Sequence, residues 1–282
     1  MYGEAGTLLG SLALHAVTGE SEFLADARTT GDEIVATSLA APRGGNGCYW
    51  EIASAAPGGP VTPYLGLLHG AAGIGFAIAH LACVTGEERY FDTARGAAEL
   101  LLTQTTAVQT SVPAAGDKAA GALSWPRHLG DTKPGLQAHC HGAGGIGQFF
   151  LMLDRLIPDP RFRETAKAAS RAVLAQRARQ TWSGICHGLS GTGHFMLDCY
   201  QAFGAPEWLG FAHECVGSLQ RSRDLERPGV YSMHGEATAS PELMLGYAGV
   251  GSFLLRLADP ARAPDLIFGH LKDPIGKGTC NV

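Results

Sequence analysis

Cysteine and histidine stand at matching places in three copies of a short glycine-rich phrase. The copies occupy residues 69–73, 140–145 and 186–191. In each copy histidine is followed by a GxxG step, and in the last two cysteine precedes the histidine. Thiolate sulfur and imidazole nitrogen are ligands that zinc takes in proteins, and a catalytic zinc keeps one position open beside three protein ligands. The phrases therefore carry side chains suited to a metal centre.

Repetition indicates where these side chains lie relative to one another. Two weaker copies of the phrase, at residues 2–6 and 245–249, lack the polar residue. A phrase repeated in this way is typical of one supersecondary unit copied around a shared core, so equivalent positions face the same place. We therefore expect Cys140, Cys186, His187 and His69 to converge at one rim of the array.

The residue types divide this set into two roles. Cys140, Cys186 and His187 supply the three ligands of a zinc site, and the glycine after each histidine permits the backbone to turn there. His69 has no cysteine before it, so we expect a general acid or base that faces the metal without binding it. Two alternatives stay open: His139 or His141 could be a ligand, and His69 could be a hydrogen-bonded core histidine.

The remaining cysteines and histidines suggest packing roles. Buried cysteine often behaves as a small hydrophobic residue, and this interpretation suits Cys83, Cys199 and Cys215, which lie within helical patterns. His80 and His194 lie farther along the expected inner helices and are interpreted as structural. Seven cysteines in 282 residues form no dense disulfide framework, which favours a reduced, cytoplasmic protein.

Each glycine phrase opens a helical hairpin. Each expected first helix is followed by a polar turn and, in the first four units, by an amphipathic second helix. The expected helix pairs are residues 8–17 with 21–39, 75–84 with 89–102, 147–156 with 161–179, and 193–203 with 206–220; the fifth unit has residues 251–257 alone. Strand patterns are almost absent. The sequence therefore predicts an all-α fold with inner helices starting at Gly3, Gly70, Gly142, Gly188 and Gly246. Two insertions, residues 40–63 and 103–139, interrupt the array, and the second should lie beside the metal rim.

Composition and other motifs exclude several classes of function. A net charge of −5 without a basic stripe argues against a nucleic-acid partner. Residues 65–84 carry no formal charge and are long enough to span a bilayer; however, they contain a phrase that recurs in more polar segments, so an inner helix of a large core is favoured. Residues 142–147 match the GxGxxG dinucleotide fingerprint, but no strand precedes them.

The ordered HG, CHG and CHG phrases at matched repeat positions resemble those of the lanthionine synthetase C-like family. The resemblance covers nearly the whole chain, 1–282, read as one LanC-like cyclase domain. It implies an α/α toroid of seven helical hairpins, of which five glycine-led units are visible here. It also implies that Cys140, Cys186 and His187 bind Zn²⁺ and that His69 is the acid/base residue.

The family's cyclases add a cysteine thiol of a dehydrated precursor peptide to dehydroalanine or dehydrobutyrine, which forms a lanthionine-type thioether ring. The resemblance therefore implies a zinc-dependent enzyme of lanthipeptide biosynthesis. The alternative to a cyclase is a non-cyclising member of the same family that binds peptide or adds glutathione to dehydroamino acids. An α/α-barrel glycosidase would need two inward carboxylates, and apart from Glu4 none of the phrases carries a carboxylate.

This sequence departs from the family pattern in two places. His139 stands where the family usually has tryptophan before the first zinc cysteine. The family's catalytic aspartate lies four residues before the first glycine of an early repeat, and counting back from Gly3 passes Met1. We expect either the C-terminal part of a larger toroid, such as the cyclase domain of a synthetase with kinase and lyase domains, or a reduced architecture.

Overall fold

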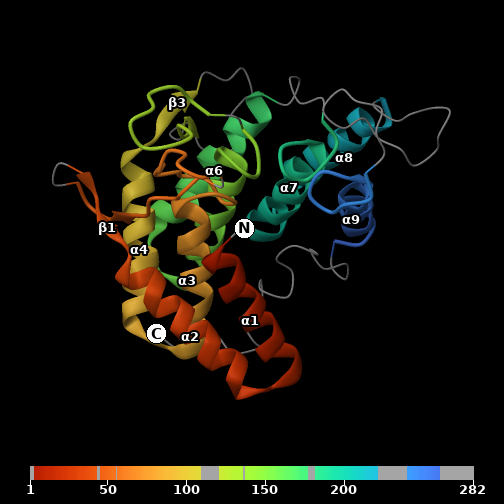
Figure 1. Ribbon diagram of the computed structural model, residues 1–282. Coiled ribbons are helices and arrows are strands. Elements are labelled where there is room, and N and C mark those ends of the chain that lie inside the picture. Colours follow the sequence, from red (N-terminus) through yellow and green to blue (C-terminus); the bar gives the residue numbers. More distant parts are fainter. Residues whose placement is uncertain are drawn as a thin grey trace.

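The computed structural model describes residues 3–42, 45–54, 56–108, 121–135, 137–176, 182–221 and 240–260 (Figure 1). Within these ranges the chain is mostly helical. The helices are α1 (Glu4–Thr18), α2 (Ser21–Ala36), α3 (Ala71–Thr85), α4 (Glu88–Thr103), α5 (Ala143–Leu156), α6 (Pro160–Ala175), α7 (Leu189–Phe203), α8 (Pro206–Arg221) and α9 (Tyr247–Ala258). The strands are β1 (Leu39–Ala40), β2 (Cys48–Tyr49), β3 (Thr106–Val108) and β4 (Ala122–Ser124).

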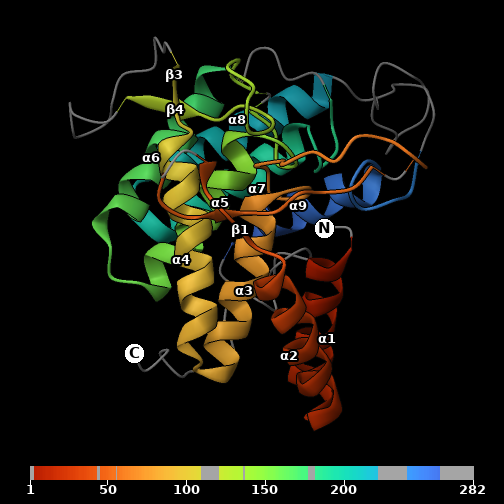
Figure 2. The ribbon, with the colours of Figure 1, turned by 60° about the vertical axis from the view of Figure 1, so that its left-hand side comes forward.

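Successive helices pair as hairpins: α1 with α2, α3 with α4, α5 with α6 and α7 with α8. Each odd-numbered helix also packs against the next odd-numbered helix, from α1 to α9, which makes these the inner layer. Figures 1 and 2 show the units following one another from red to blue. Three of the inner helices, α1, α3 and α7, end at Gly19, Gly86 and Gly204 in the left-handed conformation, with φ of 74°, 69° and 71°, which glycine adopts without a Cβ penalty. The predicted all-α hairpin architecture is confirmed.

Every inner helix begins directly after the first glycine of its phrase. The N-caps are Gly3, Gly70, Gly142, Gly188 and Gly246, as predicted. The regular helix, however, starts one turn earlier than the ranges expected from the sequence, because the GxxG step is itself the first helical turn. A Cβ on its last glycine would collide with a carbonyl oxygen six residues earlier, as at Gly73 with Leu67 and Gly191 with Ile185. The phrase is therefore glycine-rich because loop backbone lies against the helix.

The glycine two positions after the GxxG step packs against an aromatic ring from the next inner helix. A Cβ on Gly75 would lie 2.8 Å from Phe149 Cζ. The same clash recurs between Gly147 and Phe195 and between Gly193 and Phe253. All three phenylalanines are fully buried. These ring-into-glycine contacts set the spacing of neighbouring inner helices.

The two insertions contain short antiparallel strand pairs that the sequence patterns did not predict. β1 pairs with β2, and β3 pairs with β4 through three residue pairs. Two or three residues are too few for a visible alternation of polar and apolar residues. Each insertion is fixed to the helices by a tryptophan: Trp50 Nε1 donates to the Ile34 carbonyl at 2.8 Å and Trp125 Nε1 to the Leu101 carbonyl at 2.7 Å.

One hydrophobic cluster extends through the described hairpins, and a buried ion pair lies among its helices. Arg256 on α9 is 1% exposed and pairs with Asp198 on α7, which also accepts from Gln148 Nε2 at 2.9 Å. His194 accompanies this pair and contacts Ser252 Oγ at 3.2 Å. The network joins α5, α7 and α9. Among the described helices none has the length and apolarity to cross a membrane, and α3, which contains most of residues 65–84, is only 15 residues long.

Candidate metal centre

Backbone hydrogen bonds tie the equivalent residues of neighbouring phrases together. The N–H of Leu68 donates to the Cys140 carbonyl at 3.3 Å, and the N–H of Cys140 donates to the Cys186 carbonyl at 2.9 Å. The N–H of Cys186 donates in turn to the Met244 carbonyl at 2.9 Å. These four residues, which we call the rim ladder, immediately precede His69, His141, His187 and Leu245. The repeated phrase thus places two cysteines beside each other, just before the N-terminal ends of α5 and α7.

The side chains of Cys140, Cys186 and His187 meet at this rim. Their ligand atoms all lie within 4.8 Å of one another, and Cys140 Sγ is 4.0 Å from His187 Nδ1. Two sulfurs and one nitrogen around a tetrahedral zinc would be roughly 3.5–3.8 Å apart, given Zn–S of about 2.3 Å and Zn–N of about 2.0 Å. A small contraction would therefore let the three side chains bind one ion. Cys140 is buried, whereas Cys186 and His187 are half-buried, which leaves one side accessible.

The hydrogen bond between the two thiols shifts their pKa values in opposite directions. A hydrogen bond with Cys186 lowers the pKa of Cys140 to about 4, although burial opposes this change, and His187 contributes a further hydrogen bond. The same bond with Cys140, together with burial, raises the pKa of Cys186. A thiolate beside a second thiol and an imidazole is a soft donor set, which suits zinc. The residues present can hold a metal ion of this kind.

His69 lies next to this group and outside it. Its ring stacks on the ring of His141, with centroids 4.5 Å apart and planes at 15°. Burial lowers the pKa of His69 below 6.5, and the negative charge of Cys140 opposes this shift. Burial likewise lowers the pKa of His141 to about 4. At neutral pH both rings are therefore uncharged. His69 contacts His141, which directly follows Cys140 in the chain.

Two aromatic residues that sequence reasoning did not single out complete the rim. The Trp182 ring meets His187 edge-on at 4.6 Å, and the Tyr64 ring lies 5.4 Å from His141. Both residues stand six positions before the first glycine of their phrase, and that shared position is the signal that could have identified them. Their carbonyls accept from the first helical turn, from Leu189 N–H at 2.8 Å and Ala71 N–H at 3.0 Å. The aromatic ring and its helix are therefore fixed by the same loop.

The other candidates lie away from the group of three ligands. His139 is buried, and its Cβ faces Gly191 at the start of α7; neither His139 nor His141 is in the group. Cys199 and Cys215 are buried in the hydrophobic core, and Cys83 packs against it. This placement agrees with the packing roles expected for these three cysteines.

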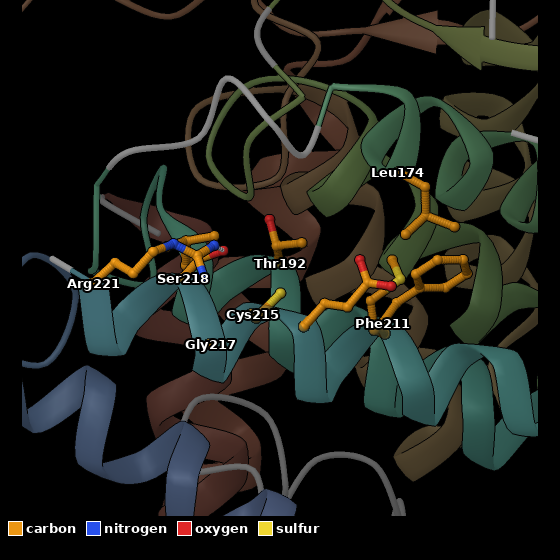
Figure 3. Close-up of a pocket in the computed structure, with 10 residues that line it drawn as sticks. Leu174, Thr192, Phe211, Cys215, Gly217, Ser218 and Arg221 are labelled. Atoms are coloured by element: carbon orange, nitrogen blue, oxygen red, sulfur yellow. Dashed lines mark hydrogen bonds between the residues drawn. The ribbon is translucent and has the colours of Figure 1, made fainter. Parts of the chain in front are cut away.

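A cavity of about 360 Å³ lies between α6, α7 and α8. Figure 3 shows Thr192 and Cys215 at its centre and Phe211 and Arg221 toward its two ends. Leu189 in the first turn of α7 lines it, and Cys186 and His187 lie in the loop just before that turn. None of the candidate ligands lines this cavity, so it is separate from the metal group.

Residues 1–268 match the lanthionine synthetase C-like protein family, and the chain belongs to that family. A curated relative from Danio rerio, named glutathione S-transferase LANCL1, is 23% identical over 206 residues. This match covers 71% of the chain and 44% of the relative, so the chain spans less than half of that protein.

Two solved structures share the fold. Nisin cyclase superposes with a TM-score of 0.66 at 13% identity, over 93% of this chain and 64% of that one. The GH76 α-mannanase BT2949 of Bacteroides thetaiotaomicron superposes with a TM-score of 0.58 at 17% identity, over 92% and 69%. At these identities the likeness defines the fold, which is the α/α toroid predicted from the sequence.

Proposed function

We propose that this protein is a zinc-dependent cyclase that adds a cysteine thiol of a dehydrated precursor peptide to dehydroalanine or dehydrobutyrine. The observation that carries this proposal is the meeting of Cys140, Cys186 and His187 at one accessible rim. Zn²⁺ held by these three side chains would lower the pKa of an incoming thiol and keep it as a nucleophilic thiolate at neutral pH. Family membership supports the same reaction class.

In this proposal His69 carries the proton that moves from the thiol to the α-carbon of the dehydroamino acid. His69 is uncharged at neutral pH because its pKa lies below 6.5, so it can accept the proton that the thiol loses. The thiolate then forms a bond to the β-carbon while the carbon–carbon double bond becomes an enolate. His69 returns the proton to the α-carbon, which completes the thioether with no net gain or loss of protons. Its stacking on His141 fixes the plane of its ring.

The metal assignment is tested by elemental analysis. The purified protein should hold one zinc, and changing both cysteines of the pair to alanine (Cys140→Ala with Cys186→Ala) should remove it. Cys199→Ala, which alters a buried cysteine on α7 away from the rim, is the matched control and should keep the zinc. Wild-type protein that holds no zinc after metal-replete expression would contradict the proposal.

The role of His69 is tested with a dehydrated precursor peptide, by following the loss of free thiol over time. His69→Ala should keep its zinc and react about 10²–10⁴-fold more slowly, the usual contribution of a positioned acid or base. An unchanged rate would remove His69 from the mechanism, and a loss of zinc would make it a ligand.

A second candidate function is the addition of glutathione to dehydroamino acids. It is favoured by the name of the Danio rerio relative, a glutathione S-transferase, and the metal group could serve either thiol. Mass spectrometry of a dehydrated peptide separates the two: ring closure leaves its mass unchanged, whereas glutathione addition raises it. Either reaction needs reduced thiols, and we propose that the protein works in the cytoplasm, alone or beside kinase and lyase domains.

A further inference from the structure

Arg127 lies at the edge of the metal centre on rigid backbone. Its carbonyl accepts from Leu65 N–H at 3.1 Å, and Leu129 N–H donates to the Pro63 carbonyl at 3.0 Å. Tyr64 and His128 form an antiparallel bridge between these two bonds. The described part of the insertion around residues 127–129 is therefore fixed against residues 63–65, with Arg127 on a short two-stranded ladder.

Aromatic rings connect Arg127 to the reacting end of the site. The Arg127 guanidinium lies over the Tyr64 ring, 5.4 Å from its centroid. Tyr64 contacts His141, and His141 stacks on His69. The positive charge of Arg127 also acts on both histidines and lowers the pKa of each, in addition to burial. The guanidinium is thus held in a fixed direction, close enough for its charge to reach the centre.

No carboxylate within the described ranges pairs with this arginine, although its side chain is exposed at the rim. Six arginines on the described helices, by contrast, pair with Asp or Glu, for example Arg95 on α4 with Asp92 at 2.7 Å. A guanidinium offers five donors in a planar fork that fits a carboxylate through two hydrogen bonds. An unmatched fork beside a reaction centre is suited to an anionic group of a substrate.

We propose that Arg127 is a specificity-determining residue that binds a carboxylate of the thiol substrate. This inference rests on the proposed thiol addition and names the class of thiol: one that carries a carboxylate near its sulfur. Tyr64 and His141 stand between Arg127 and His69, so the guanidinium does not contact the acid/base residue. Its proposed role is therefore to bind the carboxylate of the thiol substrate and not to stabilise the enolate oxygen.

The experiment compares two small thiols that differ only at this group, N-acetylcysteine and N-acetylcysteine amide, added to a short dehydroalanine peptide by the zinc-loaded protein. Wild-type protein should show a KM about fivefold lower for the carboxylate, the upper end of what an exposed ion pair contributes. Arg127→Met keeps an apolar stem over Tyr64 and should remove this preference, and Arg127→Lys should retain part of it. Ratios between variants cancel the intrinsic difference in thiol reactivity.

Arg95→Met, which removes a surface arginine on α4, is the matched control and should keep the full preference. Calorimetric titration of the same two thiols measures binding without turnover. If no thiol adds to the acceptor but the calorimetric preference depends on Arg127, the proposed function fails and the carboxylate subsite stands. Equal binding of both thiols by wild-type protein, or an Arg127→Met variant that keeps the preference, would overturn the subsite. An equal fall of kcat for both thiols would also overturn it, because it would place Arg127 in the addition step.

Discussion

Replacing Gly75 with alanine tests whether inner-helix spacing depends on the ring-into-glycine contact. In the native packing, the added Cβ would lie 2.8 Å from Phe149 Cζ on the next inner helix and 2.8 Å from Ala97 Cβ on α4. Both neighbours are fully buried in the core, so neither can move into solvent. The methyl group must displace packed helices or force Phe149 from its rotamer.

The structure sets the sign and size of this effect. Overpacking a core by one carbon costs about 1–3 kcal/mol, which offsets and exceeds the gain of up to about 1 kcal/mol from replacing helical glycine by alanine. Gly251 occupies the same phrase position on α9, and a Cβ there meets nothing within 4 Å. Gly251→Ala should therefore leave stability unchanged or raise it by up to about 1 kcal/mol. Gly10 on α1 is a second open helical site.

Urea denaturation followed by circular dichroism measures the free energy of unfolding of each variant. We expect Gly75→Ala to fall below wild type while Gly251→Ala and Gly10→Ala equal or exceed it. If Gly75→Ala were as stable as Gly251→Ala, the glycine would be there for some reason other than the phenylalanine. Double replacement of Gly75 by alanine and Phe149 by leucine should recover part of the loss, because it relieves the crowded ring edge.

Three further predictions concern a buried ion pair, a buried cysteine and a tryptophan at the rim. Asp198→Ala should lower the free energy of unfolding by about 3–5 kcal/mol, because it removes the carboxylate from the buried Arg256. Burial and Glu214 raise the pKa of Cys215 to about 12, so at pH 8 iodoacetamide should label it about a thousandfold more slowly than in the unfolded chain, as measured by mass spectrometry. Trp182→Ala should weaken zinc binding about 10–100-fold in a competition titration, because the indole orients His187.

Each of these predictions has its own control. Asp92→Ala breaks an exposed pair and should cost under about 1 kcal/mol; an equal loss at Asp198 would mean that the buried pair is worth no more than a surface one. Fast labelling of Cys215 in folded protein would contradict its raised pKa. Trp208→Ala removes a buried indole on α8, and if it weakened zinc binding as much as Trp182→Ala, the effect would be general destabilisation.

Repetition made the inner layer and the ligand group predictable. The first glycine of every phrase is an N-cap, and Cys140, Cys186 and His187 meet because their phrases are joined by equivalent backbone hydrogen bonds. The N-cap of each inner helix was predicted correctly, but the regular helical run was expected to begin one turn later, because glycine has a low helix propensity. Only the structure reveals that a neighbouring carbonyl excludes any Cβ there.

The repeat pattern could not predict the directions of the side chains at the rim. His69 and His187 share a phrase position, yet His187 joins the cysteines while His69 stacks on His141. The difference comes from what precedes and surrounds each residue, and no spacing encodes it. Arg127 was missed for a related reason: it lies in an insertion that has no counterpart in the other units, so no comparison between repeats could place it.

The rim ladder separates the chemistry of the site from the backbone that positions it. Leu68, Cys140, Cys186 and Met244 occupy one backbone position in four units and differ only in side chain. Because the hydrogen bonds use main-chain groups alone, an exchange at any of these positions leaves the ladder in place. The rim positions are therefore equivalent in backbone and free to differ in side chain. Duplication of a unit could add such a position, and a point mutation could add or remove a metal ligand there without changing the fold.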